Sequence, residues 1–183
     1  MFLLLEHPRE AGFRRREVKS ATQIEIPKFL SHLKTYGGYP VPFVQMWIDG
    51  KPDFRVIDPE KSTRCVRQKL CAICGVKLGE FCYFIGGDLC KQNHLFTDPA
   101  MHGQCAEFAT RACAFLPGRK AEYSDRPVDV SVVRVEQMAA SVRPRNMYVF
   151  TTRTKEFKFV KLEDRLMIQA VPWSRVVEIQ DAE

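Results

Sequence analysis

The hydrophobic pattern divides the chain into short elements. Four apolar residues follow helical spacing between residues 27 and 36, and the Gly37-Gly38 pair comes directly after them. Because paired glycines favour the end of a helix, the sequence predicts a short helix that begins near Pro27 and ends at this pair. Its apolar positions are Phe29, Leu30, Leu33 and Tyr36.

A β-hairpin is expected after this helix. Residues 41–48 are rich in strand-forming side chains, Asp49-Gly50 is a favoured two-residue turn, and residues 54–57 provide a returning strand. Pro52 has no backbone N–H, so the returning strand is expected at an edge of its sheet.

The segment that follows has the start signals of a helix. Asp58 is a favoured N-cap residue, Pro59 suits the first helical position, and the helix is expected to continue over 61–70. After Glu60 this segment carries cations and no acid, which is typical of a solvated face and also fits a stripe that contacts phosphates. The cations are Lys61, Arg64, Arg67 and Lys69.

The C-terminal third has the pattern of a sheet. A polar connector is expected over 118–127, and the apolar spacing over 130–142 favours a helix over a strand. Strand-like runs joined by polar turns then predict an antiparallel meander, which needs a packing partner to be stable. These runs cover 147–153, 157–162, 166–171 and 175–179.

The middle of the chain carries four metal-ligand residues in two pairs. Cys71 and Cys74 have the spacing that lets two thiolates bind one ion, and Gly75 permits the tight turn that follows. His102 and Cys105 are three residues apart, so they share one face if a helix starts at the N-cap signal Thr97-Asp98-Pro99. Three sulfur atoms and one imidazole match a closed tetrahedral structural zinc site and disfavour calcium or magnesium.

These residues resemble the treble-clef zinc fingers, in which a knuckle, a β-hairpin and a helix bind one structural Zn²⁺. The resemblance covers 71–116 and implies a hairpin of 80–85, a Gly86-Gly87 turn and a return through 95–96. Together with the N-terminal hairpin and the C-terminal antiparallel meander predicted from the pattern, it gives an expected α+β fold with a central treble clef. The segment 47–55 is also similar to one in small uncharacterised bacterial and bacteriophage zinc-binding proteins, ahead of the knuckle.

The remaining cysteines have two interpretations. Cys65, Cys82, Cys90 and His94 can be combined into a second metal site, although they lack knuckle spacing, and buried small hydrophobic residues are the alternative. Cys113 falls among apolar helical positions and is expected to pack in the core.

Composition limits the class of protein. The chain has 183 residues, 45% hydrophobic and 27% charged, seven cysteines and a net charge of +6, which indicates one globular unit with reduced thiols. No segment is long and apolar enough to span a membrane, and the apolar residues 2–5 do not form a signal peptide. We therefore expect a cytoplasmic protein. Its expected divisions are a mobile basic arm (1–22), a helix, hairpin and lead-in helix (23–70), the zinc module (71–117) and the C-terminal sheet (118–183).

Enzymatic function has little support in the sequence. Four ready ligands leave no open position on a zinc ion, and no nucleophile elbow, phosphate loop or dinucleotide motif occurs. No small-molecule substrate is evident. A histidine in the hairpin of some treble-clef nucleases activates water, which makes His94 the one candidate for such chemistry. We leave the question of catalysis open and favour a binding protein.

Two classes of partner fit. The favoured one is a protein, and the resemblance to phage proteins suggests a host protein. Trp47 and Trp173 are residue types enriched at such interfaces. The alternative is nucleic acid, bound through phosphates by basic residues. The candidate residues are Lys61, Arg64, Arg67, Lys69, Arg143, Arg145, Lys158 and Lys161.

Overall fold

The computed structural model describes residues 25–113, 146–163 and 165–179. The predictions for 1–22, 118–127 and 130–142, and for Arg143 and Arg145, lie outside these residues. Within them the fold is mixed α and β, with short helices and antiparallel sheets.

The predicted first helix is wrong. Only a 3-10 turn, η1 (Lys28–Leu30), forms there, and it is followed by a small hairpin of β1 (Thr35–Tyr36) and β2 (Tyr39–Pro40). Gly37 and Gly38 have φ angles of 58° and 84°. Two successive positive φ angles suit a two-residue hairpin turn, so these glycines reverse a strand instead of ending a helix.

The second hairpin is confirmed, with a shorter first strand. β3 (Gln45–Ile48) pairs with β4 (Lys51–Ile57) across Asp49 and Gly50, whose φ angles of 48° and 74° are those of a favoured turn. Pro52 lies in a two-stranded sheet, where a missing N–H is tolerated. Residues 41–44 instead lie beside the predicted knuckle.

The lead-in helix is confirmed. α1 (Pro59–Gln68) begins after Asp58, whose carboxylate accepts hydrogen bonds from the backbone N–H groups of Glu60 (3.0 Å) and Lys61 (3.1 Å). These bonds satisfy donors that the first turn leaves unpaired. Lys69, at φ 56°, ends the helix and turns the chain into the knuckle.

The first larger sheet joins distant parts of the chain. β7 (Met147–Arg153) lies between β5 (Phe81–Gly87) and β10 (Arg175–Ile179), antiparallel to both. Residues 147–152 are buried without alternation, as expected for a central strand. The expected hairpin of 80–85 with 95–96 is therefore wrong, because β5 pairs with β7 and runs through Gly86 and Gly87 without turning.

The second larger sheet has the order β6-β9-β8, with β6 (Leu95–Phe96), β8 (Phe157–Leu162) and β9 (Arg165–Ala170). A short helix, α2 (Asp88–Asn93), separates β5 from β6. The four C-terminal strands were predicted nearly to the residue, but they do not form one meander. The chain leaves the first sheet after β7, builds β8 and β9 in the second, and returns as β10.

An aromatic core joins the two sheets. Phe84 of β5 lies 4.7 Å from Phe96 of β6 and 5.5 Å from Phe157 of β8 between ring centroids, and Phe150 of β7 lies 5.2 Å from Phe96. All four rings are at most 1% exposed. Burial of each contributes about 2–3 kcal/mol, so this cluster holds the sheets together.

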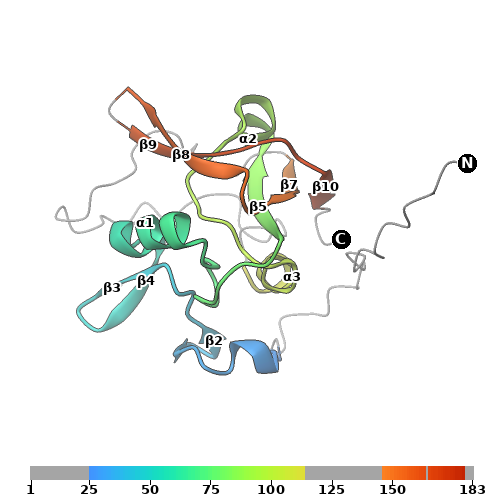
Figure 1. Ribbon diagram of the computed structural model, residues 1–183. Coiled ribbons are helices and arrows are strands. Elements are labelled where there is room, and N and C mark those ends of the chain that lie inside the picture. Colours follow the sequence, from blue (N-terminus) through green and yellow to red (C-terminus); the bar gives the residue numbers. More distant parts are fainter. Residues whose placement is uncertain (1–24, 114–145, 164, 180–183) are drawn as a thin grey trace, which may run out of the picture.

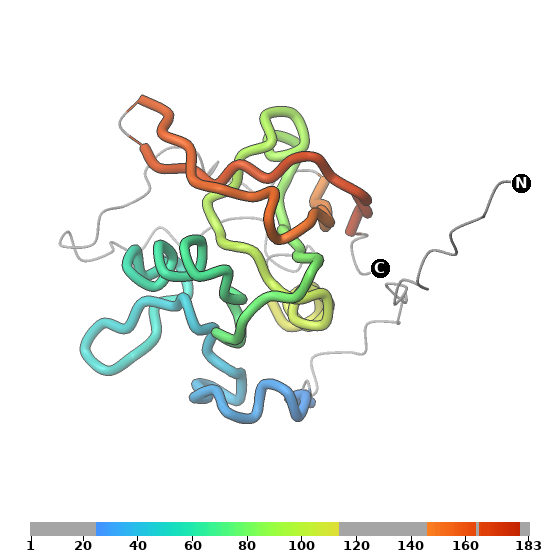
Figure 2. Tube along the Cα trace, viewed as in Figure 1, coloured from blue at the N-terminus to red at the C-terminus, as the bar shows by residue number. Residues whose placement is uncertain are grey.

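Figures 1 and 2 show how the remaining elements surround these sheets. α1 lies between the β8–β9 ribbon and the β3–β4 hairpin, and it packs against β8. α3 (Gly103–Ala112) packs against β5. None of the described helices has the length and apolar character needed to cross a membrane.

Candidate metal centre

The first half of the centre is a tight turn that follows α1. The backbone N–H of Gly75 donates to the carbonyl of Cys71 (2.9 Å), and that of Cys71 donates to the carbonyl of Val76 (2.8 Å). Gly75 has a φ of 72°, and a Cβ atom there would lie 2.9 Å from the Phe43 ring. The conformation and the close contact both require glycine.

The second half lies at the start of α3, later than predicted. Asp98 is not the N-cap; its carboxylate instead accepts a hydrogen bond from Thr97 Oγ1 (3.2 Å). The chain stays extended because Met101 exchanges two 2.9 Å backbone hydrogen bonds with Tyr83. The helix begins after His102, so His102 occupies the N-cap position and Cys105 lies in the first turn.

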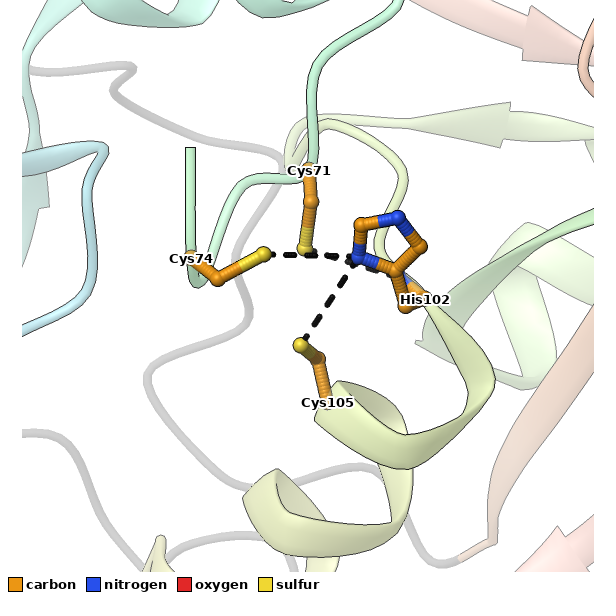
Figure 3. A group of neighbouring side chains, drawn as sticks. All are labelled: Cys71, Cys74, His102 and Cys105. Atoms are coloured by element: carbon orange, nitrogen blue, oxygen red, sulfur yellow. Dashed lines mark hydrogen bonds between the residues drawn. The ribbon is translucent and has the colours of Figure 1, made fainter. Parts of the chain in front are cut away.

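The four predicted ligands come together (Figure 3). Their ligand atoms all lie within 4.8 Å of one another, and the three cysteines are buried. His102 Nδ1 is 3.4 Å from Cys74 Sγ and 4.0 Å from Cys105 Sγ. Ordinary Zn–N and Zn–S bond lengths place two tetrahedral ligand atoms roughly 3.6 Å apart. The group therefore has the size and donor set to hold a metal ion. Among the described residues it is the one group of three or more such side chains with this spacing.

The hydrogen bonds of His102 select its ligand atom. Nε2 lies 3.0 Å from the carbonyl oxygen of Lys77, which can only accept, so Nε2 carries a proton. Nδ1 faces the sulfur atoms and is the nitrogen left to bind a metal (Figure 3). A backbone acceptor that orients the imidazole in this way is typical of metal-binding histidines.

Three side chains of the cluster have strongly shifted pKa values. Hydrogen bonds from Cys105 and Cys71 lower the pKa of Cys74, and hydrogen bonds with Cys71 and Cys74 raise the pKa of His102 to about 10. The same two thiols raise the pKa of Cys105. These directions favour a thiolate at Cys74 beside a protonated His102 and a protonated Cys105. A bound cation would replace those protons.

Backbone hydrogen bonds connect the knuckle to three other segments. Ala72 N–H donates to the carbonyl of Ala100 (2.9 Å), just before α3, and Phe43 N–H donates to the carbonyl of Ile73 (2.8 Å). His32 Nε2 lies 3.0 Å from the carbonyl oxygen of Cys74. The centre therefore lies where the N-terminal hairpins, the knuckle and α3 meet.

The contacts of His32 and of the Lys77 carbonyl were not predicted. His32 has no nearby ligand residue in sequence, and a backbone carbonyl carries no residue-type signal. Only the fold brings them to the centre.

The other cysteines do not form a second site. Cys65, Cys82, Cys90 and His94 do not come together, and burial raises the pKa of Cys65 and of Cys82 to about 12, which keeps both as thiols. The prediction that Cys113 packs in the core is wrong, because it ends α3 in an exposed position.

His94 lies outside the metal cluster. Its ring packs against Trp173 at 4.5 Å between centroids, and its buried Nδ1 has no hydrogen-bond partner within the part of the chain that the structure describes. Trp173 packs in turn on Phe150 at 4.7 Å. Trp173 is thus partly buried against the core.

The predicted basic residues have different environments. Lys61 is engaged within the fold, with its ammonium 3.5 Å from Asp58 and 3.0 Å from the Gln45 carbonyl. Lys69 is half-buried, and its ammonium donates to the carbonyl of Phe157. Four others are exposed: Arg64, Arg67, Lys158 and Lys161.

No family model matches the chain, and no curated protein or solved structure matches it either.

Proposed function

We propose that this chain is a non-enzymatic binding protein whose fold is stabilised by one structural zinc ion. The observation that carries the proposal is the closed group of Cys71, Cys74, His102 and Cys105, which supplies three sulfur atoms and one nitrogen atom. Zinc is the metal that most often takes this ligand set, and four protein ligands complete its tetrahedral coordination. Catalytic zinc keeps a position for water or substrate, which this arrangement does not provide.

The order of ligands supports a treble-clef-like organisation. Two come from a knuckle and two from the N-terminal end of a helix, as in that family. The bridge between Tyr83 and Met101 takes the place of the hairpin of that family. The elements α2 and β6 lie between these two residues in the sequence. Zinc binding would therefore contribute directly to the folding free energy of this region.

A protein partner is supported by aromatic side chains on the N-terminal hairpins. Tyr36, Tyr39 and Phe54 are 44%, 43% and 53% exposed, and the rings of Tyr36 and Phe54 lie 6.5 Å apart. Exposed aromatic residues that lie close together are typical of protein interfaces. We name Tyr36, Tyr39 and Phe54 the aromatic surface. The resemblance of 47–55 to phage proteins extends the proposal to a host protein in the cytoplasm, where thiols stay reduced.

The metal centre would hold this surface in place. Residues 41–44, which connect the two hairpins, bond to the knuckle through Phe43 and Val44, and His32 bonds to it from the preceding segment. Loss of the ion would thus free both hairpins.

Thermal unfolding with and without a zinc chelator tests the structural role. We expect the chelator to lower the melting temperature strongly, and equimolar zinc to restore it. A melting curve that the chelator leaves unchanged would contradict a structural zinc.

Photo-cross-linking tests the partner. A benzophenone amino acid replaces Phe54 in producing cells, and we expect a discrete protein adduct. The same replacement of Leu89, which is 57% exposed on α2, is the matched control and should give none. Adducts at both positions, or at neither, would count against the aromatic surface.

A further inference from the structure

An open depression lined by cations lies beside the metal centre. Its volume is about 500 Å³, and its lining includes three exposed cationic side chains, the half-buried Lys69 and one carboxylate. The polar residues that line it are Lys69, Lys77, Glu80, Arg153, Thr154 and Lys155. We name it the cationic depression.

Backbone hydrogen bonds hold its three segments together. Leu78 N–H donates to the carbonyl of Lys69 (2.8 Å), which joins the end of α1 to the segment 76–80 after the knuckle. Thr154 joins the β7–β8 turn to the same segment, because its N–H donates to the Glu80 carbonyl (2.8 Å) and its hydroxyl donates to the Gly79 carbonyl (2.6 Å). The cations therefore converge through the fold, from positions up to 86 residues apart.

The metal centre positions one side of the depression. Lys77 pairs with Leu70 in an antiparallel bridge, and its carbonyl accepts the hydrogen bond from His102 Nε2. The knuckle that carries Cys71 and Cys74 lies between these two residues. Bound zinc would thus fix the position of the Lys77 backbone, to which its side chain is attached.

The lining favours an anionic ligand over an apolar one. Lys77, Arg153 and Lys155 are exposed, and among the described residues Lys155 has Glu156 as its one ion-pair partner, at 4.0 Å. Of the described residues that line the depression, Leu78 is the one apolar side chain, and it is 6% exposed. Protein interfaces centre on buried apolar or aromatic anchors, which this surface does not offer.

Further exposed cations lie on α1 and β8, the elements that adjoin Lys69 and Lys155 in the chain. Arg64 and Arg67 lie on the exposed part of α1 before Lys69, and Lys158 and Lys161 lie on β8, which packs against α1. Figure 1 shows these two elements side by side. An open basic surface fits a polymer of regularly spaced charges better than a small enclosed ligand.

We propose that the cationic depression binds the phosphodiester backbone of nucleic acid. Lysine and arginine side chains contact phosphates without reading bases, so binding should be independent of sequence and should weaken as salt rises. This inference goes beyond the proposed function, because it adds a second ligand to the protein partner. It rests on the metal-held fold for the position of Lys77.

Fluorescence anisotropy with a short labelled DNA duplex over a salt series tests the proposal. The full-length protein is compared with the double variant Lys77→Gln/Arg153→Gln, which removes two charges from the depression. Each lost phosphate contact lowers the slope of log K against log salt by about 1 in magnitude, so the slope of the variant should be smaller by about 2. The variant should also bind at least about tenfold more weakly at low salt.

The double variant Lys28→Gln/Lys51→Gln is the matched control. Both lysines are exposed and lie outside the depression, so the net charge falls equally while affinity and salt dependence should stay near those of the wild type. A wild type that does not bind at low salt would overturn the proposal. Equal affinity of the depression variant and the wild type would overturn it as well. If poly-glutamate binds as tightly as DNA, the depression accepts acidic polypeptides equally well, and the proposal of a nucleic-acid ligand is overturned.

Zinc content and melting temperature of each variant separate this proposal from the structural role of zinc. We expect both variants to keep wild-type values, so that weaker binding reports on the depression alone. If the wild type binds DNA through the depression but contains no zinc, the proposed metal role fails while the phosphate site stands.

Discussion

The imidazole Nε2 of His102 lies 3.0 Å from the carbonyl oxygen of Lys77. This one contact links the candidate metal centre to the cationic depression, because His102 belongs to the cluster and Lys77 lines the depression. It also determines which imidazole nitrogen faces the cysteines. The cluster, the knuckle and the cationic depression are therefore expected to respond together when His102 changes.

His102→Cys and His102→Ala should differ in metal content. A cysteine restores a fourth donor and gives a four-sulfur site that zinc also accepts, whereas alanine leaves three ligands. We expect one zinc per chain in the first variant and reduced content in the second, measured by elemental analysis after gel filtration. Equal content in the two variants would mean that position 102 is not a ligand.

Gly75→Ala should destabilise the knuckle. Alanine at a φ of 72° costs about 1–2 kcal/mol, and its Cβ would meet the Phe43 ring at 2.9 Å, so the free energy of unfolding should fall by at least this amount. Gly79→Ala is the control, because a Cβ atom at that position would meet nothing within 4 Å. Denaturant unfolding measures both, and equal losses would show that the Gly75 conformation is not special.

Phe84→Ala should damage the contact between the two sheets. The ring is 1% exposed and touches Phe96 and Phe157, so its removal should cost about 3–5 kcal/mol in unfolding free energy. Phe54→Ala removes a ring that is 53% exposed and should change stability by less than about 1 kcal/mol. Similar losses for both substitutions would contradict the aromatic core.

Stability should fall in alkaline solution. Burial raises the pKa of Cys82 from its ordinary 9.0 to about 12, so between these values the folded state keeps a proton that the unfolded state has lost. The unfolding free energy then decreases as pH rises, by at most about 1.4 kcal/mol per pH unit for one thiol. Cys82→Ala should lose this part of the decrease, which unfolding curves recorded from about pH 8 to 11 would reveal. If the unfolding free energies of the wild type and of Cys82→Ala depend on pH in the same way, the Cys82 thiol is not buried as described.

Local signals in the sequence were sufficient to predict the Cys71, Cys74, His102 and Cys105 cluster and several elements. The spacing of Cys71 and Cys74 identified the knuckle, the Asp49-Gly50 turn identified a hairpin, and Asp58-Pro59 identified the start of α1. In each case a few adjacent residues determine the conformation through caps, turn angles or ligand spacing.

Strand pairing could not be predicted in the same way. The sequence of β5 fits either a strand of a local hairpin or a strand that pairs with a distant part of the chain. Its partner in the structure, β7, lies beyond residue 145. Gly86-Gly87 has the composition of a turn, yet the chain continues through it into α2. Such choices depend on which distant apolar faces can be buried together, and a local pattern does not contain that information.

The start of α3 shows the same limit. Thr97-Asp98-Pro99 has good helix-start chemistry, but the bridge between Met101 and Tyr83 keeps this stretch extended and moves the start to Gly103. The structure brings His102 and Cys105 into the cluster, although the helix start beside them differs from the prediction. Metal-ligand spacing tolerates such shifts better than helix boundaries do.

Zinc per chain in the wild type and in Cys74→Ser tests the central claim most directly. Cys113→Ser is the matched control, because Cys113 is exposed and lies outside the cluster. The account predicts one zinc in the wild type and in Cys113→Ser, and loss of zinc with a lower melting temperature in Cys74→Ser. A wild type free of zinc, or a Cys74→Ser variant that keeps its zinc and its stability, would contradict the account.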